Sequence, residues 1–165
     1  MSLGQSLLPE FDHEMAGTRK TLGRVPEDKL GWRPHAKSMT LGELATHIAH
    51  IPEWSQTVAN DEEFDMGTST QEVKKPDTRQ GILDYFDKSA EGFKKVLQGK
   101  SDEHLFQSWK LLNKGEAVLE MPRAACIRSF ILSHGIHHRG QLSVYLRLND
   151  VPLPSIYGPS ADEGM

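Results

Sequence analysis

The stretch RAACIRSFILSHGIHHRGQLSVYLRLN, residues 123–149, is the longest run of helical periodicity in the chain. On a helical wheel of about 100° per residue, its apolar side chains share one face about 120° wide with two histidines and a glutamine. The residues of this face are Ile127, Phe130, Ile131, His134, His138, Gln141, Leu142, Tyr145 and Leu148. A long helix with one apolar face is typical of a helical bundle, in which neighbouring helices cover that face.

Three further helices are predicted upstream of this stretch. The first covers about residues 3–24 and ends before Val25-Pro26, because proline disfavours helix in the residue before it. The second covers residues 41–60, where Thr40 and Glu43 form a capping box and Pro52 predicts a kink or short break. The third begins after Asp77 or Thr78 and closes near Gly99.

The remaining segments contain few helical signals. Residues 60–75 are predicted to be a long loop, and residues 106–122 are predicted to be a short β-hairpin turning at Asn113-Lys114-Gly115. The segment YGPSADE, residues 157–163, is expected to fold back on the bundle. The fold class is therefore all-α, an up-and-down four-helix bundle with a short hairpin before the last long helix, in a single domain of residues 1–165.

Composition and charge narrow the classes of function. A net charge of −4 and a pI near 6 argue against binding to a phosphate backbone, so no nucleic-acid partner is expected. No apolar run of about 18 residues is present that could span a membrane. The start of the chain does not resemble a signal peptide, and the one cysteine, Cys126, has no partner for an internal disulfide. We expect a cytoplasmic protein.

The histidines carry the strongest functional signal. His134 and His138 are separated by four residues on the predicted helix, so both imidazoles can reach one metal ion at about 2.0 to 2.1 Å. On the second helix His47 lies just inside the buried face, whereas His50 lies about 60° further round. Three neutral imidazoles leave a divalent metal with open coordination positions, as in catalytic sites. His47, His134 and His138 are thus the candidate metal ligands.

A structural interpretation of these histidines competes with the metal site. A single histidine on an apolar face is more often a core residue with one or two hydrogen bonds than a ligand. The pairing of two inward histidines on one helix, with a third on another, favours the metal. We interpret His13, His35 and His104 as surface or loop residues, and Cys126 as a packing residue.

The residues around this site resemble a known family. TLGELATHIAHIPEW (residues 40–54), HGIHHRGQLSVYLRLNDVPLPSIYGPSADE (residues 134–163), FDHEMAGTRKTL (residues 11–22) and GWRPHAKSM (residues 31–39) are similar to segments of the DinB/YfiT-like proteins. The resemblance implies a four-helix bundle of unusual connectivity, usually a homodimer, that binds nickel, zinc or a similar divalent ion. The family's three ligands correspond to His47, His134 and His138.

The resemblance also implies classes of activity. Characterised relatives include transferases that use a low-molecular-weight thiol such as bacillithiol or mycothiol, and a mycothiol-dependent maleylpyruvate isomerase. The first hypothesis is therefore a metal-dependent transferase with a low-molecular-weight thiol cosubstrate and a small-molecule substrate. The alternatives are a metal-dependent hydrolase that activates water, and a non-catalytic metal-binding or sensing protein. Gln141 is a candidate hydrogen-bond partner for a ligand imidazole. The candidate residues for the wall of a pocket are Trp32, Trp54, Trp109 and Tyr145. Arg139 is expected on the solvated surface.

Overall fold

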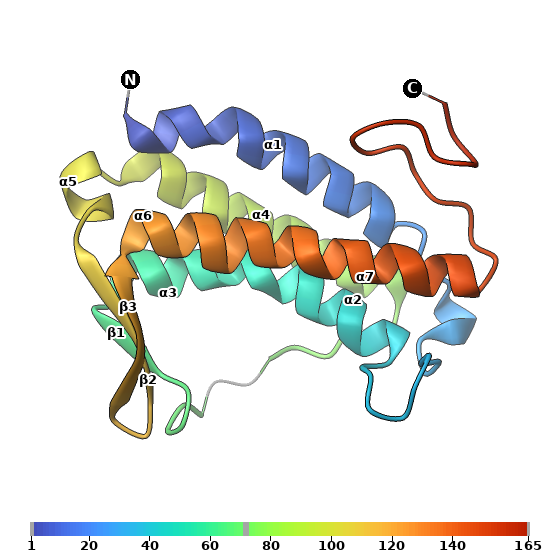
Figure 1. Ribbon diagram of the computed structural model, residues 1–165, viewed down its shortest axis with the longest axis horizontal. Coiled ribbons are helices and arrows are strands. Elements are labelled where there is room, and N and C mark those ends of the chain that lie inside the picture. Colours follow the sequence, from blue (N-terminus) through green and yellow to red (C-terminus); the bar gives the residue numbers. More distant parts are fainter. Residues whose placement is uncertain (1, 71–72, 165) are drawn as a thin grey trace.

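The computed structural model describes residues 2–70 and 73–164, which form a bundle of helices with a small sheet at one end (Figure 1). The long elements are α1 (Leu3–Leu22), α4 (Arg79–Gly99) and α7 (His134–Leu148). The shorter helices are η1 (Glu27–Lys29), α2 (Leu41–His50), η2 (Ile51–Glu53), α3 (Trp54–Asn60), α5 (Asp102–Leu105), α6 (Arg123–Cys126) and η3 (Ile127–Ser133). The predicted mainly helical fold, with a hairpin before the last helix, is confirmed.

Local sequence signals determine where most of these helices begin. The Thr40 side chain accepts a hydrogen bond from the Glu43 backbone N–H, and the Glu43 carboxylate accepts one from the Thr40 N–H. This capping box begins α2 at the predicted residue. Pro52 interrupts the second helix as a single 3₁₀ turn, η2, so that α2 and α3 follow one another with the predicted break. Thr78 caps α4.

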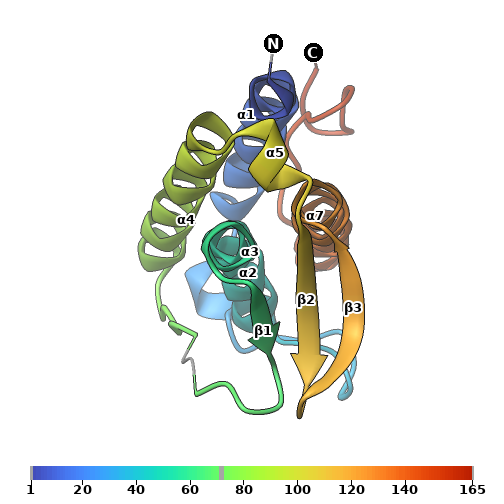
Figure 2. The same cartoon turned by 90° about the vertical axis from the view of Figure 1, so that its left-hand side faces the viewer.

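The helices α2 and α4 run in the same direction along the bundle, so the predicted up-and-down order is wrong for these two helices (Figure 1). The described parts of the connection, residues 61–70 and 73–78, lie along the bundle, and α4 starts from the same end as α2 (Figure 1). Seen end-on, α2–α3 lie between α4 and α7, while α1 covers the top of the bundle (Figure 2). Two clusters of buried apolar side chains fill the space between the helices. One includes Phe93 and Ile131, and the other includes Leu44 and Phe86.

A three-stranded sheet lies at the end of the bundle near α3 and α6 (Figures 1 and 2). The predicted hairpin is formed by β2 (Ser108–Asn113) and β3 (Glu116–Pro122), which pair antiparallel. Its turn residues Lys114 and Gly115 have φ values of 53° and 83°, as a two-residue turn requires. The prediction of a structureless loop was wrong at β1 (Glu63–Asp65), which pairs parallel with β2. A three-residue strand has no periodicity of its own, and β2 supplies its hydrogen-bonding partners.

The last helix contains a π-helical segment that changes its register. The η3 segment is wound with more than 3.6 residues per turn. The buried face of α7 is therefore rotated from the face that a helical wheel of constant 100° steps predicts. The buried residues of α7 are Arg139, Leu142 and Leu146, whereas Leu148, which the wheel placed on the apolar face, is 58% exposed. His134 and His138 therefore lie half-buried at the edge of the core and not at its centre.

Arg139 is buried, so the prediction that it lies on the solvated surface was wrong. Its side chain is ion-paired with Glu14 at 2.8 Å, and it donates hydrogen bonds to the Thr18 hydroxyl and the Tyr157 hydroxyl. Tyr157 in turn donates to the Glu14 carboxylate at 2.8 Å. The charge is thus compensated inside the bundle by groups from α1 and from the C-terminal segment, which the sequence of α7 does not contain.

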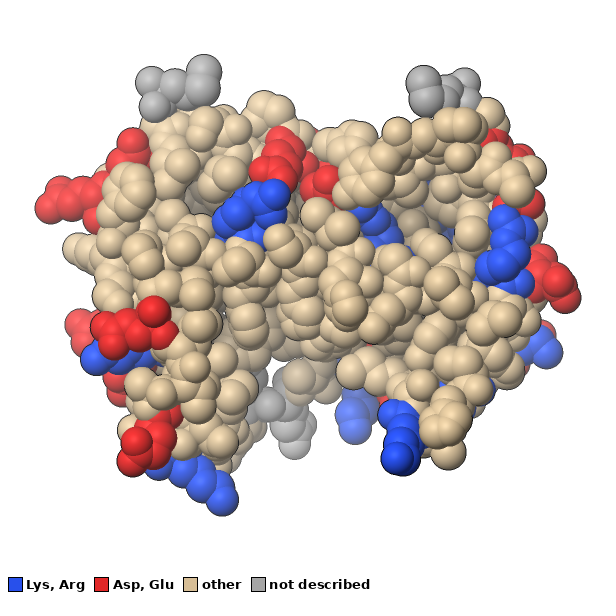
Figure 3. All heavy atoms as spheres, viewed as in Figure 1, with Lys and Arg blue, Asp and Glu red and all other residues tan. Residues whose placement is uncertain are grey.

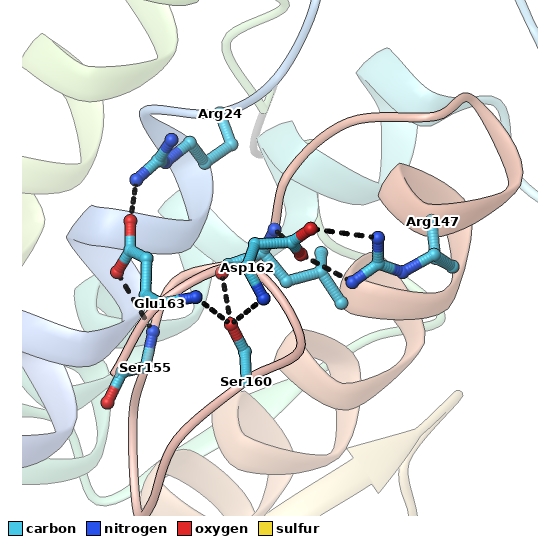
Figure 4. Close-up of polar contacts among 7 residues, drawn as sticks. Arg24, Arg147, Ser155, Ser160, Asp162 and Glu163 are labelled. Carbon is cyan, nitrogen blue, oxygen red and sulfur yellow. Dashed lines mark hydrogen bonds and ion pairs between the residues drawn. The ribbon is translucent and has the colours of Figure 1, made fainter. Parts of the chain in front are cut away.

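The C-terminal segment folds back on the bundle, as predicted (Figure 4). Asp162 forms an ion pair with Arg147 of α7, and Glu163 forms one with Arg24 at the end of α1. The Ser160 hydroxyl accepts hydrogen bonds from the backbone N–H groups of Asp162 and Glu163, which holds the turn between the two ion pairs. The segment is therefore attached to two helices that are far apart in sequence.

Removal of residues 155–165 is expected to lower the melting temperature by about 4 to 8 °C. The truncation takes the Tyr157 hydroxyl away from the buried Glu14 and Arg139, which then lose one hydrogen-bonding partner each. Calorimetry checks this change, and removal of residues 164–165 alone is the control. Equal melting temperatures for the full chain and the longer truncation would contradict the structural role of the segment.

Charged side chains are interspersed on the face of the molecule over α7. In Figure 3, several of the Lys and Arg side chains on this face lie beside Asp or Glu, and the middle of the face is uncharged. Within the described residues, no helix is long and apolar enough to cross a membrane.

Candidate metal centre

Three histidines from two helices converge at the edge of the core. His47 comes from α2, and His134 and His138 come from successive turns of α7. The Nε2 atom of His134 lies 2.8 Å from Nε2 of His138 and 3.4 Å from Nε2 of His47. One nitrogen from each ring lies within 4.8 Å of the others, and all three rings are half-buried. The structure therefore brings together the three residues that the sequence analysis selected.

Hydrogen bonds at the outer edges of two rings determine which nitrogen carries the proton. The Gln141 side-chain carbonyl, one turn after His138, accepts a hydrogen bond from Nδ1 of His138 at 2.7 Å. The Phe130 backbone carbonyl, one turn before His134, accepts a hydrogen bond from the His134 ring. Since Nε2 of His134 faces the other two rings, this donor is Nδ1. The Nε2 atoms of both rings are then unprotonated acceptors in the neutral state.

This arrangement places lone pairs against one another. Two unprotonated Nε2 atoms at 2.8 Å cannot hydrogen-bond to each other, because neither carries a hydrogen. A cation between them would remove this repulsion. The predicted hydrogen bond between Gln141 and a candidate ligand is thus present, and it orients the free nitrogen of His138 inward.

The pKa values of the three imidazoles are all lowered from the ordinary value of 6.5. Burial, followed by the neighbouring His138 and His134, lowers the pKa of His47 to about 4. Burial is also the largest cause of the lowered pKa of His134 and of His138. At neutral pH the three rings are consequently neutral, which is the state that binds metal.

The donor set fits one divalent ion. Two imidazoles bound at about 2.0 to 2.1 Å place their nitrogens about 2.9 Å apart at a right angle and about 3.4 Å apart at a tetrahedral angle. Two of the three separations between the ring nitrogens, 2.8 Å for His134–His138 and 3.4 Å for His47–His134, are close to these values. Imidazole ligands without a carboxylate suit zinc, nickel, copper or iron better than magnesium or calcium.

Other residues considered in the sequence lie away from this centre. Cys126 is fully buried in the core, where burial raises its pKa to about 11, so it remains a thiol among apolar side chains. Trp109 is fully buried in the core, so the prediction that it forms a pocket wall was wrong. Trp54 packs edge-on against Phe130, whose ring lies beside His134. His104 lies apart from the cluster, and its Nε2 atom is hydrogen-bonded to the Ala59 carbonyl oxygen at 2.7 Å.

The prediction that His50 lies outside the buried face of the second helix was wrong, because its side chain is buried beside this centre. Nδ1 of His50 lies 2.6 Å from the Tyr85 hydroxyl, and the Tyr85 hydroxyl donates to the Glu53 carboxylate at 2.6 Å. Burial, and then Glu53, raises the pKa of Tyr85, so the hydroxyl keeps its proton. The His50 ring is therefore held by a chain of hydrogen bonds. The spacing of His50 and Glu53 was the only signal in the sequence, since Tyr85 lies on another helix.

A cavity of about 270 Å³ borders His47 and His50. Its walls are formed by α2 and by the segment that precedes α4, and its lining residues are Gly42, Glu43, Thr46, His47, His50, Val73, Lys74, Lys75 and Pro76. The rings of Trp32 and Tyr145 pack edge to face, with their centres 5.6 Å apart, and neither residue lines this cavity. The cavity gives a small molecule a place beside one of the three clustered histidines.

The metal-free protein is expected to lose stability as the pH falls from about 6.5 to about 4. The unfolded chain takes up protons on these histidines near pH 6.5, whereas folded His47 resists protonation down to a pKa of about 4. In this window the unfolded state binds more protons, so the free energy of unfolding decreases with decreasing pH. Urea unfolding in the presence of a chelator at pH 7.5 and pH 5 checks the effect. The His47→Asn variant should lose less stability between these pH values; an equal loss would contradict the cause.

The fold and the site define a class of protein: a helical bundle with a cluster of three histidines at the edge of its core, fitted to a divalent metal. The model of the DinB family matches residues 1–164, so the chain belongs to the DinB family.

Individual relatives agree with this assignment. The chain is 25% identical over 157 residues to the uncharacterized protein YrdA of Bacillus subtilis (strain 168), a match that covers 94% of this chain and 89% of that protein. Its fold is similar to that of a DinB-like protein from Bacillus cereus ATCC 10987, with a TM-score of 0.70, 21% identity, and 93% and 97% of the two chains covered. The DinB-like protein YjoA of Bacillus subtilis has a TM-score of 0.68 at 20% identity, covering 90% of this chain and 96% of that one.

Proposed function

We propose that His47, His134 and His138 bind one divalent metal ion, nickel or zinc, and that the loaded protein is a transferase that uses a low-molecular-weight thiol. The observation that supports the metal most strongly is the pair of unprotonated Nε2 atoms of His134 and His138, 2.8 Å apart, each oriented by a hydrogen bond at the opposite edge of its ring. A cation between the two nitrogens would remove the repulsion between their lone pairs.

The residues at this centre have two roles: some bind the metal and others orient the ligand rings. His47, His134 and His138 are ligands and not proton carriers, because the lone pairs of their inner nitrogens are used for the ion. Gln141 and the Phe130 carbonyl maintain the ring orientations. A bound divalent ion supplies the charge that lowers the pKa of a thiol or water beside it. All three rings are half-buried, so the centre lies at the edge of the core.

The cavity beside His47 supports an activity on small molecules. A cavity of about 270 Å³ holds a compound of metabolite size, and the residues on its α2 wall include one of the three clustered histidines. A thiol at the metal and an electrophile in this cavity would lie close together, and this positioning lowers the barrier to transfer.

The test is turnover by the metal-loaded protein with a panel of thiols and electrophiles. Cysteine, glutathione and mercaptoethanol, each with chlorodinitrobenzene, test transfer, and nitrophenyl acetate without thiol tests hydrolysis. We expect thiol-dependent turnover that disappears in the His134→Ala/His138→Ala variant. Turnover of the ester without thiol would instead support the hydrolase. Strong stabilisation by metal with no turnover of any pair would support a non-catalytic metal-binding or sensing protein.

A further inference from the structure

The cavity between α2 and the segment preceding α4 has an excess of positive charge. Lys74 and Lys75 lie in its wall opposite the helix, and Glu43 is the one carboxylate among the lining residues that the structure describes. Glu43 accepts a hydrogen bond from the Thr40 backbone N–H at 2.7 Å and keeps its negative charge, so the two lysines exceed it by one positive charge. A divalent ion on three neutral imidazoles would add further positive charge at the His47 edge. The combination favours an anionic ligand.

The same cavity presents a hydrogen-bond acceptor. Tyr85 donates its hydroxyl hydrogen to Glu53, so its oxygen accepts from Nδ1 of His50 at 2.6 Å. The hydrogen of neutral His50 is therefore on Nδ1, and its Nε2 is an acceptor. None of the hydrogen bonds of His50 within the described part of the chain uses Nε2. Because His50 is part of the lining, this nitrogen is available to a ligand that carries a hydroxyl or thiol.

The lysines and the histidine are close enough to act on one small molecule. The Lys74 ammonium lies 5.7 Å from the centre of the Tyr85 ring, which is the ring that holds His50. The hydrogen bonds with Thr40 lower the pKa of the Glu43 carboxyl most, and the charges of Arg33 and then Lys75 lower it further. The positive wall thus faces both histidines of the cavity.

We propose that this cavity binds a small organic acid that also carries a hydroxyl or thiol group, with its carboxylate toward Lys74 and Lys75 and its protic group toward His50. The inference adds a substrate class to the proposed metal centre and rests on it only for the charge at the His47 edge. The lysines and the acceptor nitrogen belong to the chain itself.

The experiment measures binding of four small probes to the zinc-loaded protein by calorimetry. Mercaptoacetate and glycolate carry a carboxylate, and mercaptoethanol and ethylene glycol are their neutral counterparts. We expect each acid to bind at least about tenfold more tightly than its neutral counterpart, with the preference reduced in high salt. The Lys74→Ala/Lys75→Ala variant should lose about three- to tenfold in affinity for both acids and little for mercaptoethanol.

Matched controls separate the cavity from metal chelation and from net charge. The Lys20→Ala/Lys95→Ala variant makes the same change in net charge on exposed residues outside the cavity, and it should bind the acids as the parent protein does. A direct chelate on the metal would bind equally to both lysine variants. Equal affinities of the two lysine variants for glycolate would therefore overturn the proposal.

The acceptor role of His50 can be tested by NMR without a substitution that would disturb the buried hydrogen bonds among His50, Tyr85 and Glu53. In ¹⁵N spectra of the zinc protein, Nε2 of His50 should be unprotonated, and glycolate should shift its resonance. A resonance that is unchanged at saturating glycolate would overturn the acceptor role.

The outcomes for the thiol chemistry are distinct from those for the acid. Equal binding of mercaptoacetate and mercaptoethanol to the metal would support the thiol transferase and reject the anionic substrate class. Lysine-dependent binding of glycolate, with no thiol bound to the metal, would support the anionic substrate class and reject the thiol.

Discussion

Replacement of His134 and His138 together by alanine is expected to reduce bound metal from about one equivalent per chain to less than about a tenth of an equivalent. The two rings supply the closest pair of facing nitrogens, 2.8 Å apart, and His47 alone cannot hold the ion against solvent. Mass spectrometry of the untagged protein, purified with metal present throughout, measures the content directly. The same samples should show a lower melting temperature for the variant only when metal is present.

The matched control replaces two histidines that the structure places outside the cluster. His13 and His35 are both exposed, and the His35 ring accepts a hydrogen bond from the nearby Lys37 backbone N–H. The His13→Ala/His35→Ala variant should therefore retain about one equivalent of metal. Equal metal in both variants, or none in the parent protein after metal is supplied, would reject the metal centre and leave three core histidines.

Replacement of Arg139 by alanine is expected to lower the free energy of unfolding by about 3 to 5 kcal/mol. Arg139 is 4% exposed and Glu14 is 6% exposed, so the substitution leaves a carboxylate buried without its cation. The Tyr157 hydroxyl, which also bonds to Glu14, compensates only part of that charge. Urea unfolding of the metal-loaded protein at pH 7 measures the difference.

Arg147 is the matched control on the same helix. Its ion pair with Asp162 is partly exposed, with 45% of the Arg147 side chain accessible, so Arg147→Ala should cost no more than about 1 kcal/mol. The Glu14→Leu/Arg139→Met double variant should recover most of the lost stability, because neither charge is then left alone. Similar losses for Arg139→Ala and Arg147→Ala would show that the buried pair has no special role.

The spacing of His134 and His138 illustrates how much of the site could be predicted from sequence. Two residues four apart on a helix share a face whatever surrounds the helix, and Gln141 follows His138 at the distance of one turn. His47 could be selected because the capping box at Thr40 determines where α2 begins and thus which residues face inward. In each case the deciding contacts are between residues close in sequence.

Other features of the site depend on contacts between distant segments. The pairing of β1 with β2 joins residues 63–65 to 110–112, and neither segment specifies that partner. The hydrogen bond between His50 and Tyr85 joins residues 35 positions apart in the sequence. The cavity beside them forms because the segment before α4 lies along α2. Arg139 is polar in sequence and buried in the fold, because α1 and the C-terminal segment bring it a carboxylate and a hydroxyl.

The sequence by itself determined the helices, the hairpin turn and the three candidate ligands, since these follow from backbone geometry and hydrogen bonds within a few residues. Only the tertiary structure decided the register of α7 after η3, the half-buried position of the histidines, and the charges and acceptor that surround the cavity. The physical reason is that burial and electrostatic environment are properties of the neighbours in space, and those neighbours come from segments far apart along the chain.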